Sequence, residues 1–288
     1  MLLPVDIKLS CIEEEKSDNQ GDYQTVDEKI SELVHDQISS WDKLLESETR
    51  KAIHASASGI FFCKEKRLRK SLLQSIRNGS LTRFGYFKWI ERVTKRPELY
   101  FNQKTGNPLF LDAYLVDQPK YNSYSTKFIR TMLWTCPKSR PYLAQIKNKA
   151  GLSGWMAAIL RGNQTILMGF PQKILQNERG PLRSTPLMVA AGKGRLQILK
   201  FLLTQVDDTD QCNQLGLTAL DFAKHGQGSD AVKCEMIRLL KLFQSNSFKV
   251  DAVCERAEVY ESVVESSRLW RNIYEKDMRD FRLLNLAR

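Results

Sequence analysis

Residues 185–203 read TPLMVAAGKGRLQILKFLL. A threonine followed by proline is a common start of a helix, because the hydroxyl caps the first amides and proline needs no hydrogen bond at the first helical position. Gly194 permits a tight turn, and the apolar residues after it have the spacing of a second helix. The stretch therefore predicts two short antiparallel helices joined by a tight turn.

Related patterns occur at a regular interval on both sides of this stretch. TALDFA begins 33 residues after Thr185, and SGWMAA begins 32 residues before it. An Asn-x-x-Gly sequence precedes the last and the first of these three units, at 213–216 and 148–151. A period of this length predicts a solenoid, in which each helix pair packs on the next.

The three units resemble the ankyrin repeat, which combines a Thr-Pro-Leu start, two alanines, a turn glycine and paired aliphatic residues. Two weaker units at 102–134 and 72–79 resemble it as well. The resemblance implies an all-α ankyrin-repeat solenoid over 66–249, with about five repeats of which two are degenerate, and helical extensions at both ends.

The sequence departs from the repeat pattern at three points, and the first leads to a specific expectation. Pro171 replaces a leucine, so the second helix of that unit should be shifted or broken, with Leu175 taking over the missing contact. Gln227 stands where the last unit should have its turn glycine, although a glycine lies on either side. The histidine of the family pattern is missing from every unit.

Charge divides the chain into an acidic head, a basic body and a nearly neutral tail. Residues 1–60 carry −7, residues 61–249 carry +19 and residues 250–288 carry −1, which sum to the net charge of +11. Such a body can attract an acidic partner, an anionic lipid or a nucleic acid.

The N-terminal region divides into two predicted parts. Residues 1–24 are polar and acidic, and are predicted to be disordered. A capping box at 25–28 opens an amphipathic helix within a predicted N-terminal cap at 25–65, whose apolar stripe should cover the first end of the solenoid. A helix lying on a membrane is the alternative, and its acidic polar face disfavours that.

Residues 250–288 are predicted to be a C-terminal helical cap or tail. The alternative is an exposed aromatic stripe that recruits a partner, with Trp270 and Tyr274 as anchors. Glutamates and serines at 258–267, with Leu286 near the end, also resemble the C-terminal signals of type IV-secreted ankyrin-repeat effectors of intracellular bacteria. A solvated helix face fits the same residues equally well.

The sequence also predicts where in the cell the protein is found. No apolar stretch approaches the roughly 20 residues of a membrane helix, and the start lacks the pattern of a secretory signal peptide. The expectation is a cytoplasmic protein without a membrane span, and the effector resemblance extends it to secretion into the cytosol of a host cell.

No constellation for catalysis stands out in the sequence. The motifs of P-loop NTPases, zinc proteases, serine hydrolases and protein kinases are missing. Six cysteines without a CxxC pair and three histidines favour neither a metal site nor a disulfide framework, so no cofactor and no enzyme activity are expected. The enzyme alternative rests on Cys63, which could be a nucleophile with His54 nearby in the sequence as its base. A cysteine packed in the core is the simpler interpretation of Cys63.

The segment 64–96 offers another alternative. It is basic and contains aromatic residues, as single-stranded nucleic-acid binders do. Phe84 and Phe87 have the spacing of a buried helix face, however, so nucleic acid is the less favoured partner.

The function that the resemblance implies is binding of a protein partner, and the basic body favours an acidic one. The contact residues should lie on the loops and first helices, at positions that packing between repeats does not use. Eight residues meet this description: Lys149, Trp155, Arg161, Arg183, Lys193, Gln214, Phe222 and Lys224. Trp155 is ambiguous, because it also occupies a position that packs inside the repeat.

Overall fold

The computed structural model describes residues 20–57, 107, 111, 115, 145, 147–244, 256–269 and 272. Its named elements are α1 (Gln20–Ala57), α7 (Gly154–Leu160), α8 (Gln164–Leu167), α9 (Gln172–Asn177), the 3-10 turn η4 (Pro181–Arg183), α10 (Pro186–Gly192), α11 (Leu196–Leu203), α12 (Ala219–His225) and α13 (Asp230–Gln244). A further helix covers 256–269. Apart from one isolated bridge between Lys147 and Ser153, the regular structure of these residues is helical, so the all-α class is confirmed for them.

Three short helix pairs follow one another along 153–244: α7 with α8, α10 with α11, and α12 with α13. Each first helix starts after a hydroxyl residue, at Ser153, Thr185 and Thr218, and each hydroxyl accepts a hydrogen bond from the amide three residues on. The hydroxyl residues that recur at a regular interval in the sequence are therefore the N-caps of these three helices.

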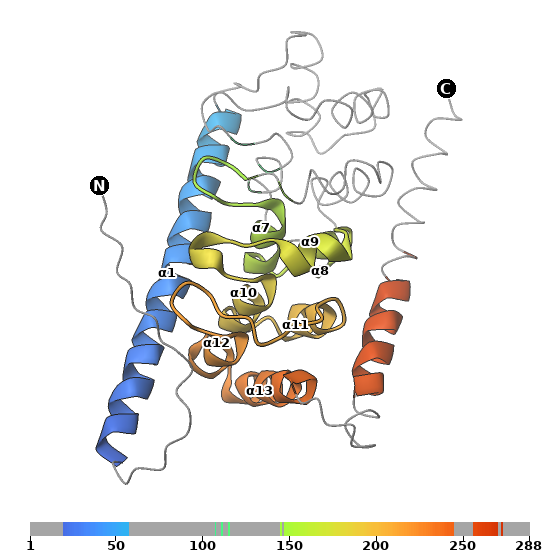
Figure 1. Ribbon diagram of the computed structural model, residues 1–288. Helices are drawn as coiled ribbons and strands as arrows, with labels where there is room; N and C mark the ends of the chain where they lie inside the picture. Colours follow the sequence, from blue (N-terminus) through green and yellow to red (C-terminus); the bar gives the residue numbers. More distant parts are fainter. Residues whose placement is uncertain are drawn as a thin grey trace, which may run out of the picture.

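The first helices α7, α10 and α12 pack side by side and form an inner layer, and α11 and α13 pack together behind it (Figure 1). Alanines line the contacts within the inner layer, and Ala157, Ala158, Ala190, Ala191 and Ala223 are fully buried. Their short side chains let neighbouring helices approach closely, which explains why alanine recurs in all three first helices and is paired in the first two.

The turns between paired helices also pack on one another. Gly194 has φ of 63°, and a Cβ there would lie 2.3 Å from the carbonyl oxygen of Gln227 in the next unit. Gln227 itself donates its backbone N–H to Gly192 over 2.8 Å. In the last unit the left-handed backbone moves to Gly228, with φ of 128°, which accommodates glutamine at the position where the pattern has glycine.

The break expected at Pro171 is confirmed. Helix α8 ends at Leu167 after only four residues, and Pro171 is the N-cap residue of α9. Leu175 in α9 is fully buried. The proline thus divides the second helix of this unit in two, while Leu175 restores an apolar contact.

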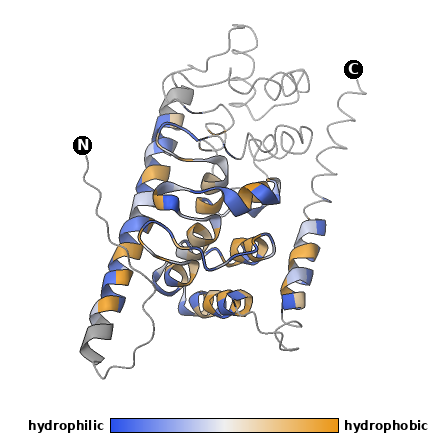
Figure 2. Ribbon diagram, in the orientation of Figure 1, coloured by the Kyte–Doolittle hydropathy of each residue, from blue (hydrophilic) through white to orange (hydrophobic). Residues whose placement is uncertain are grey.

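Helix α1 runs lengthwise along the inner layer and contacts α7, α10 and α12 (Figure 1). This differs from the expected cap over the first end of the repeats, because α12 belongs to the last helix pair described. Helix α1 also begins at Gln20, ahead of the expected capping box at 25–28. Apolar and polar residues alternate along it (Figure 2), and the buried ones include Val34, Ile38 and Trp41.

The helix at 256–269 lies beside the second layer, on the side of the stack opposite α1 (Figure 1). Arg256 donates to the carbonyl of Leu242 over 2.9 Å and lies over the ring of Phe243, 5.7 Å from its centroid. One side of α13, which includes Cys234, Arg238 and Lys241, is exposed. The described part of the tail therefore packs beside the last pair and does not cover that side of α13. Trp270 and Tyr274 lie outside the described residues.

Candidate functional site

The candidate site is the inner face, which we define as α7, α10 and α12 together with the loops before them. We call these three loops, 147–153, 179–185 and 211–218, the loop row. Each loop is bonded to the next one. Lys147 Nζ donates to the carbonyl of Arg179 over 2.8 Å, and Arg179 Nη2 donates to Gln211 Oε1 over 2.5 Å. The loop row is thus a connected edge of the stack.

Arg179 sits at the centre of this edge. Its other nitrogen, Nη1, donates to the carbonyls of Gln176 and Glu178 over 2.8 Å each. Burial, and after it the positive charge of Arg183, lower the pKa of the Arg179 guanidinium below its ordinary value. Arginine remains charged at physiological pH, so Arg179 is a permanent cation that holds successive loops together.

Two asparagines join the loop row to α1. Asn213 Oδ1 accepts the backbone N–H of Leu215 and of Leu217, and its Nδ2 donates to Gln37 Oε1 over 3.0 Å. Asn148 shapes its own loop in the same way, and its Nδ2 donates to Glu48 Oε2 over 2.7 Å. Gln37 and Glu48 are eleven residues apart, about three helical turns, so they lie on the same side of α1.

An aromatic contact fixes the middle of α1. The rings of Trp41 and Phe222 stack with centroids 5.3 Å apart and an angle of 23° between their planes. Gly192 lies beneath this contact, because a Cβ there would come within 3.1 Å of both rings and 3.3 Å of Ile38 Cδ1. The glycine at the end of α10 therefore leaves the space that α1 fills.

Polar pairs surround the aromatic contact. Lys193 Nζ donates to Asp42 Oδ1 over 2.7 Å, and the lysine side chain is only 8% exposed. Arg161 Nη2 donates to Thr49 Oγ1 over 3.0 Å. Basic and polar groups of the inner face thus pair with residues of the acidic N-terminal region.

Four of the eight contact residues predicted from the sequence are not accessible to a partner in this arrangement. Arg161, Lys193 and Phe222 are engaged by α1. Trp155 requires a correction, because it is fully buried, and its ring limits the space beside Gly180 in the loop of the next unit. The packing role is therefore the right interpretation of Trp155.

The other four predicted residues are exposed: Lys149, Arg183, Gln214 and Lys224. The first three lie on the three successive loops of the loop row, and Lys224 lies near the end of α12. The structure thus divides the predicted site into an inner part that α1 covers and an outer part that faces solvent.

Sequence reasoning missed the residues of α1 that complete the face, above all Gln37, Asp42 and Glu48. The available signal was the opposite charge of the head and the body, together with an apolar stripe longer than an end cap needs. What could not be read from the sequence was where along the repeats these residues lie.

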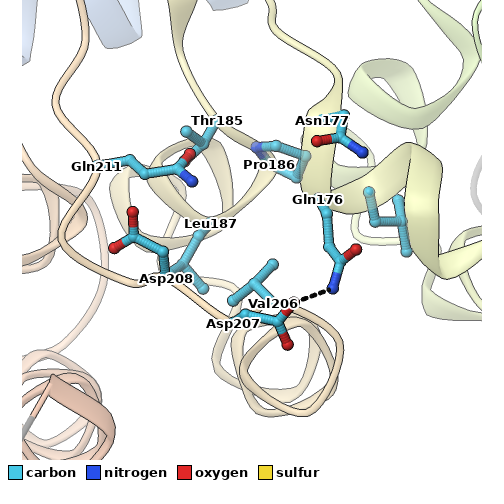
Figure 3. Close-up of a pocket in the computed structure, with 10 residues that line it drawn as sticks. Gln176, Asn177, Thr185, Pro186, Leu187, Val206, Asp207, Asp208 and Gln211 are labelled. Atoms are coloured by element: carbon cyan, nitrogen blue, oxygen red, sulfur yellow. Dashed lines mark hydrogen bonds between the residues drawn. The ribbon is translucent and has the colours of Figure 1, made fainter.

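A shallow pocket lies between α9, the start of α10 and the loop after α11 (Figure 3). Gln176 Nε2 donates to Asp207 Oδ2 over 2.9 Å at its rim, and Asp208 and Gln211 lie nearby. The pocket residues combine carboxylates, amides, aliphatic groups and the hydroxyl of Thr185, which accepts the backbone N–H of Met188 as the N-cap of α10. This lining does not point to a reaction.

Other expectations fall partly or wholly outside the described residues. Within that part of the chain, no cluster of three or more metal-ligating side chains occurs, and no helix is long and apolar enough to cross a membrane. Cys63, the segment 64–96 and Leu286 lie outside it, as does the side chain of His54. Glu258, Glu261 and Glu265 are exposed on their helix, and their resemblance to a secretion signal stays a prediction.

Comparison with known proteins adds no relative: no family model, no curated protein and no solved structure matches this chain.

Proposed function

We propose that this chain is an ankyrin-repeat protein that binds a protein partner of acidic character through the loop row and the inner face. The observation that carries the proposal is the exposed set on the loop row. Lys149, Arg183 and Gln214 lie on the corresponding loops of three successive units, and their side chains are exposed. The backbone N–H of Gln214 donates to the carbonyl of Leu182 over 2.9 Å and so holds its loop to the one before it. The neighbouring loop residues are buried or bonded, so the loop row offers variable side chains on a fixed support.

Charge supports an acidic partner. The exposed basic residues Lys149 and Arg183 on the loop row and Lys224 near the end of α12 belong to a body that carries +19. Positive residues around an interface steer an acidic protein and raise its association rate, most strongly at low salt. The alternative is a basic surface that serves only solubility, and it predicts no preference for one side of the stack.

The test compares two triple variants of the full chain with equal charge change. One carries Lys149→Glu, Arg183→Glu and Lys224→Glu, and the control carries Lys173→Glu, Lys241→Glu and Arg268→Glu, which are exposed on other surfaces. Partners cross-linked to the wild-type chain in cells are identified by mass spectrometry, and their association rates with each variant are measured at several salt concentrations.

We expect the first variant to lose most of the association rate and of its salt dependence. The control should bind nearly as the wild-type chain does. Equal weakening by both variants would favour diffuse electrostatics and contradict the proposed face, provided that circular dichroism shows both variants folded.

A further inference from the structure

Helix α1 touches the inner face along one narrow stripe. Among its described side chains at 25–52, the buried ones are Val34, Gln37, Ile38, Trp41, Glu48 and Ala52. The other side chains of this range are at least partly exposed. A core helix would bury a wider surface, whereas an amphipathic helix held in a groove buries such a stripe.

The contacts of the stripe follow a defined pattern around Trp41. Apolar residues stand three and seven positions before it, at Ile38 and Val34, and carboxylates stand one and seven positions after it, at Asp42 and Glu48. Each carboxylate meets a different unit, since Asp42 pairs with Lys193 and Glu48 accepts a hydrogen bond from Asn148. The inner face therefore reads both the apolar spacing and the acidic positions of a helix.

The fit of α1 is not complete. The indole Nε1 of Trp41 is buried and has no hydrogen-bond partner in the described part of the chain. A buried donor without an acceptor weakens the contact, because the N–H has lost its water. A different helix with phenylalanine at this position would avoid the loss and still stack on Phe222.

We propose that the inner face is a receptor for acidic amphipathic helices, and that α1 is an internal occupant which a helix of the same pattern on the partner replaces. This inference rests on the proposed function and specifies the part of the partner that binds. Because α1 belongs to the same chain, it competes intramolecularly, so it excludes weaker helices and admits only a partner that fits better or binds the loop row at the same time.

The test measures binding of a fluorescently labelled peptide with the sequence of residues 25–52 to the full-length chain. The wild-type chain should bind it weakly, because its own α1 competes. Asp42→Lys in the chain removes the pair with Lys193 and should tighten peptide binding about ten-fold. Trp41→Ala should tighten it about thirty-fold or more, the usual effect of removing a central interface tryptophan.

Asp36→Lys is the matched control, because it makes the same charge change on the exposed side of α1. It should alter peptide affinity by less than about two-fold. A second control exchanges the charges: a peptide with Asp42→Lys should bind the Trp41→Ala chain poorly and should prefer a chain with Lys193→Asp. A scrambled peptide of the same composition should not bind.

Equal peptide affinity of the wild-type, Asp42→Lys and Trp41→Ala chains would overturn the inference, and so would equal binding of the scrambled peptide. If Trp41→Ala unfolds the chain, the test rests on the milder Asp42→Lys. Its peptide affinity must then exceed that of the Asp36→Lys chain for the inference to stand. The loop-row variant is the chain with Lys149→Glu, Arg183→Glu and Lys224→Glu. If this variant loses the partner while the peptide fails to replace α1 in any chain, the proposed function stands and α1 is a permanent part of the fold. Normal partner binding by the loop-row variant would instead reject the proposed function.

Discussion

Replacing Gly192 by alanine tests the position of α1 by the sign of a stability change. Gly192 is the last residue of α10 and has a negative φ, so alanine should favour the helix by about 0.5–1 kcal/mol. The added Cβ would also meet Trp41 Cζ3 and Phe222 Cδ1 at 3.1 Å and Ile38 Cδ1 at 3.3 Å. Overpacking of this kind costs about 1–3 kcal/mol, so we expect a net loss of about 1 kcal/mol.

The assay is urea unfolding followed by circular dichroism. With a slope of about 2 kcal/mol per molar urea, this loss lowers the midpoint by about 0.5 M. In a chain that also carries Trp41→Ala, one of the two 3.1 Å contacts is gone and the Phe222 ring has room to move, so Gly192→Ala should become nearly neutral or stabilising. The expected coupling between the two substitutions is about 1–2 kcal/mol. A stabilising effect of Gly192→Ala of equal size in both backgrounds would refute the placement of Trp41 over α10.

Three further predictions concern stability. Ala190→Arg should destabilise the chain by about 3 kcal/mol or more, because Ala190 is fully buried between inner helices; an unchanged melting temperature would contradict the helix register. Asn213→Ala should cost about 2 kcal/mol in urea unfolding, since two backbone N–H groups lose their acceptor, and Asn213→Asp should cost less because it keeps that acceptor. Hydrogen bonding from Arg238 lowers the pKa of the Glu235 carboxyl, so its stabilisation is present above the ordinary carboxyl pKa and is lost as pH falls through the lowered value. Glu235→Gln should therefore cost about 0.5 kcal/mol at pH 7 and almost nothing at pH 2, and an equal cost at both pH values would exclude this origin.

Much of the repeat architecture in 153–244 could be predicted from the sequence. The capping residues Ser153, Thr185 and Thr218 and the alanine pairs act within a few residues of themselves, so their meaning depends little on the rest of the chain. The same holds for Pro171, whose ring and missing N–H interrupt a helix wherever it occurs. Local chemistry of this kind is readable because its partners are neighbours in the sequence.

The candidate site was predicted less completely. The exposed positions of Lys149 and Gln214 follow from the period, because each stands four residues before the N-cap of its first helix, and Arg183 lies in the corresponding loop, two residues before its N-cap. Trp155 could not be assigned, since a tryptophan in a framework position can pack inward or face a partner. Only the packing of the whole unit decides between these, and it buries Trp155 completely.

By itself, the sequence determined that the N-terminal segment is an amphipathic acidic helix and that the repeats are basic. It did not determine where that helix lies, because 96 residues (58–153) separate α1 from α7 and helical periodicity holds no information on a distant partner. The tertiary structure decided it: Gly192 leaves space for Trp41, Lys193 pairs with Asp42, and Asn148 and Asn213 meet the two polar residues three turns apart. No single contact of this set fixes the position of α1. A rigid helix has only one register in which all of these steric and electrostatic contacts form at once, and that register sets its position.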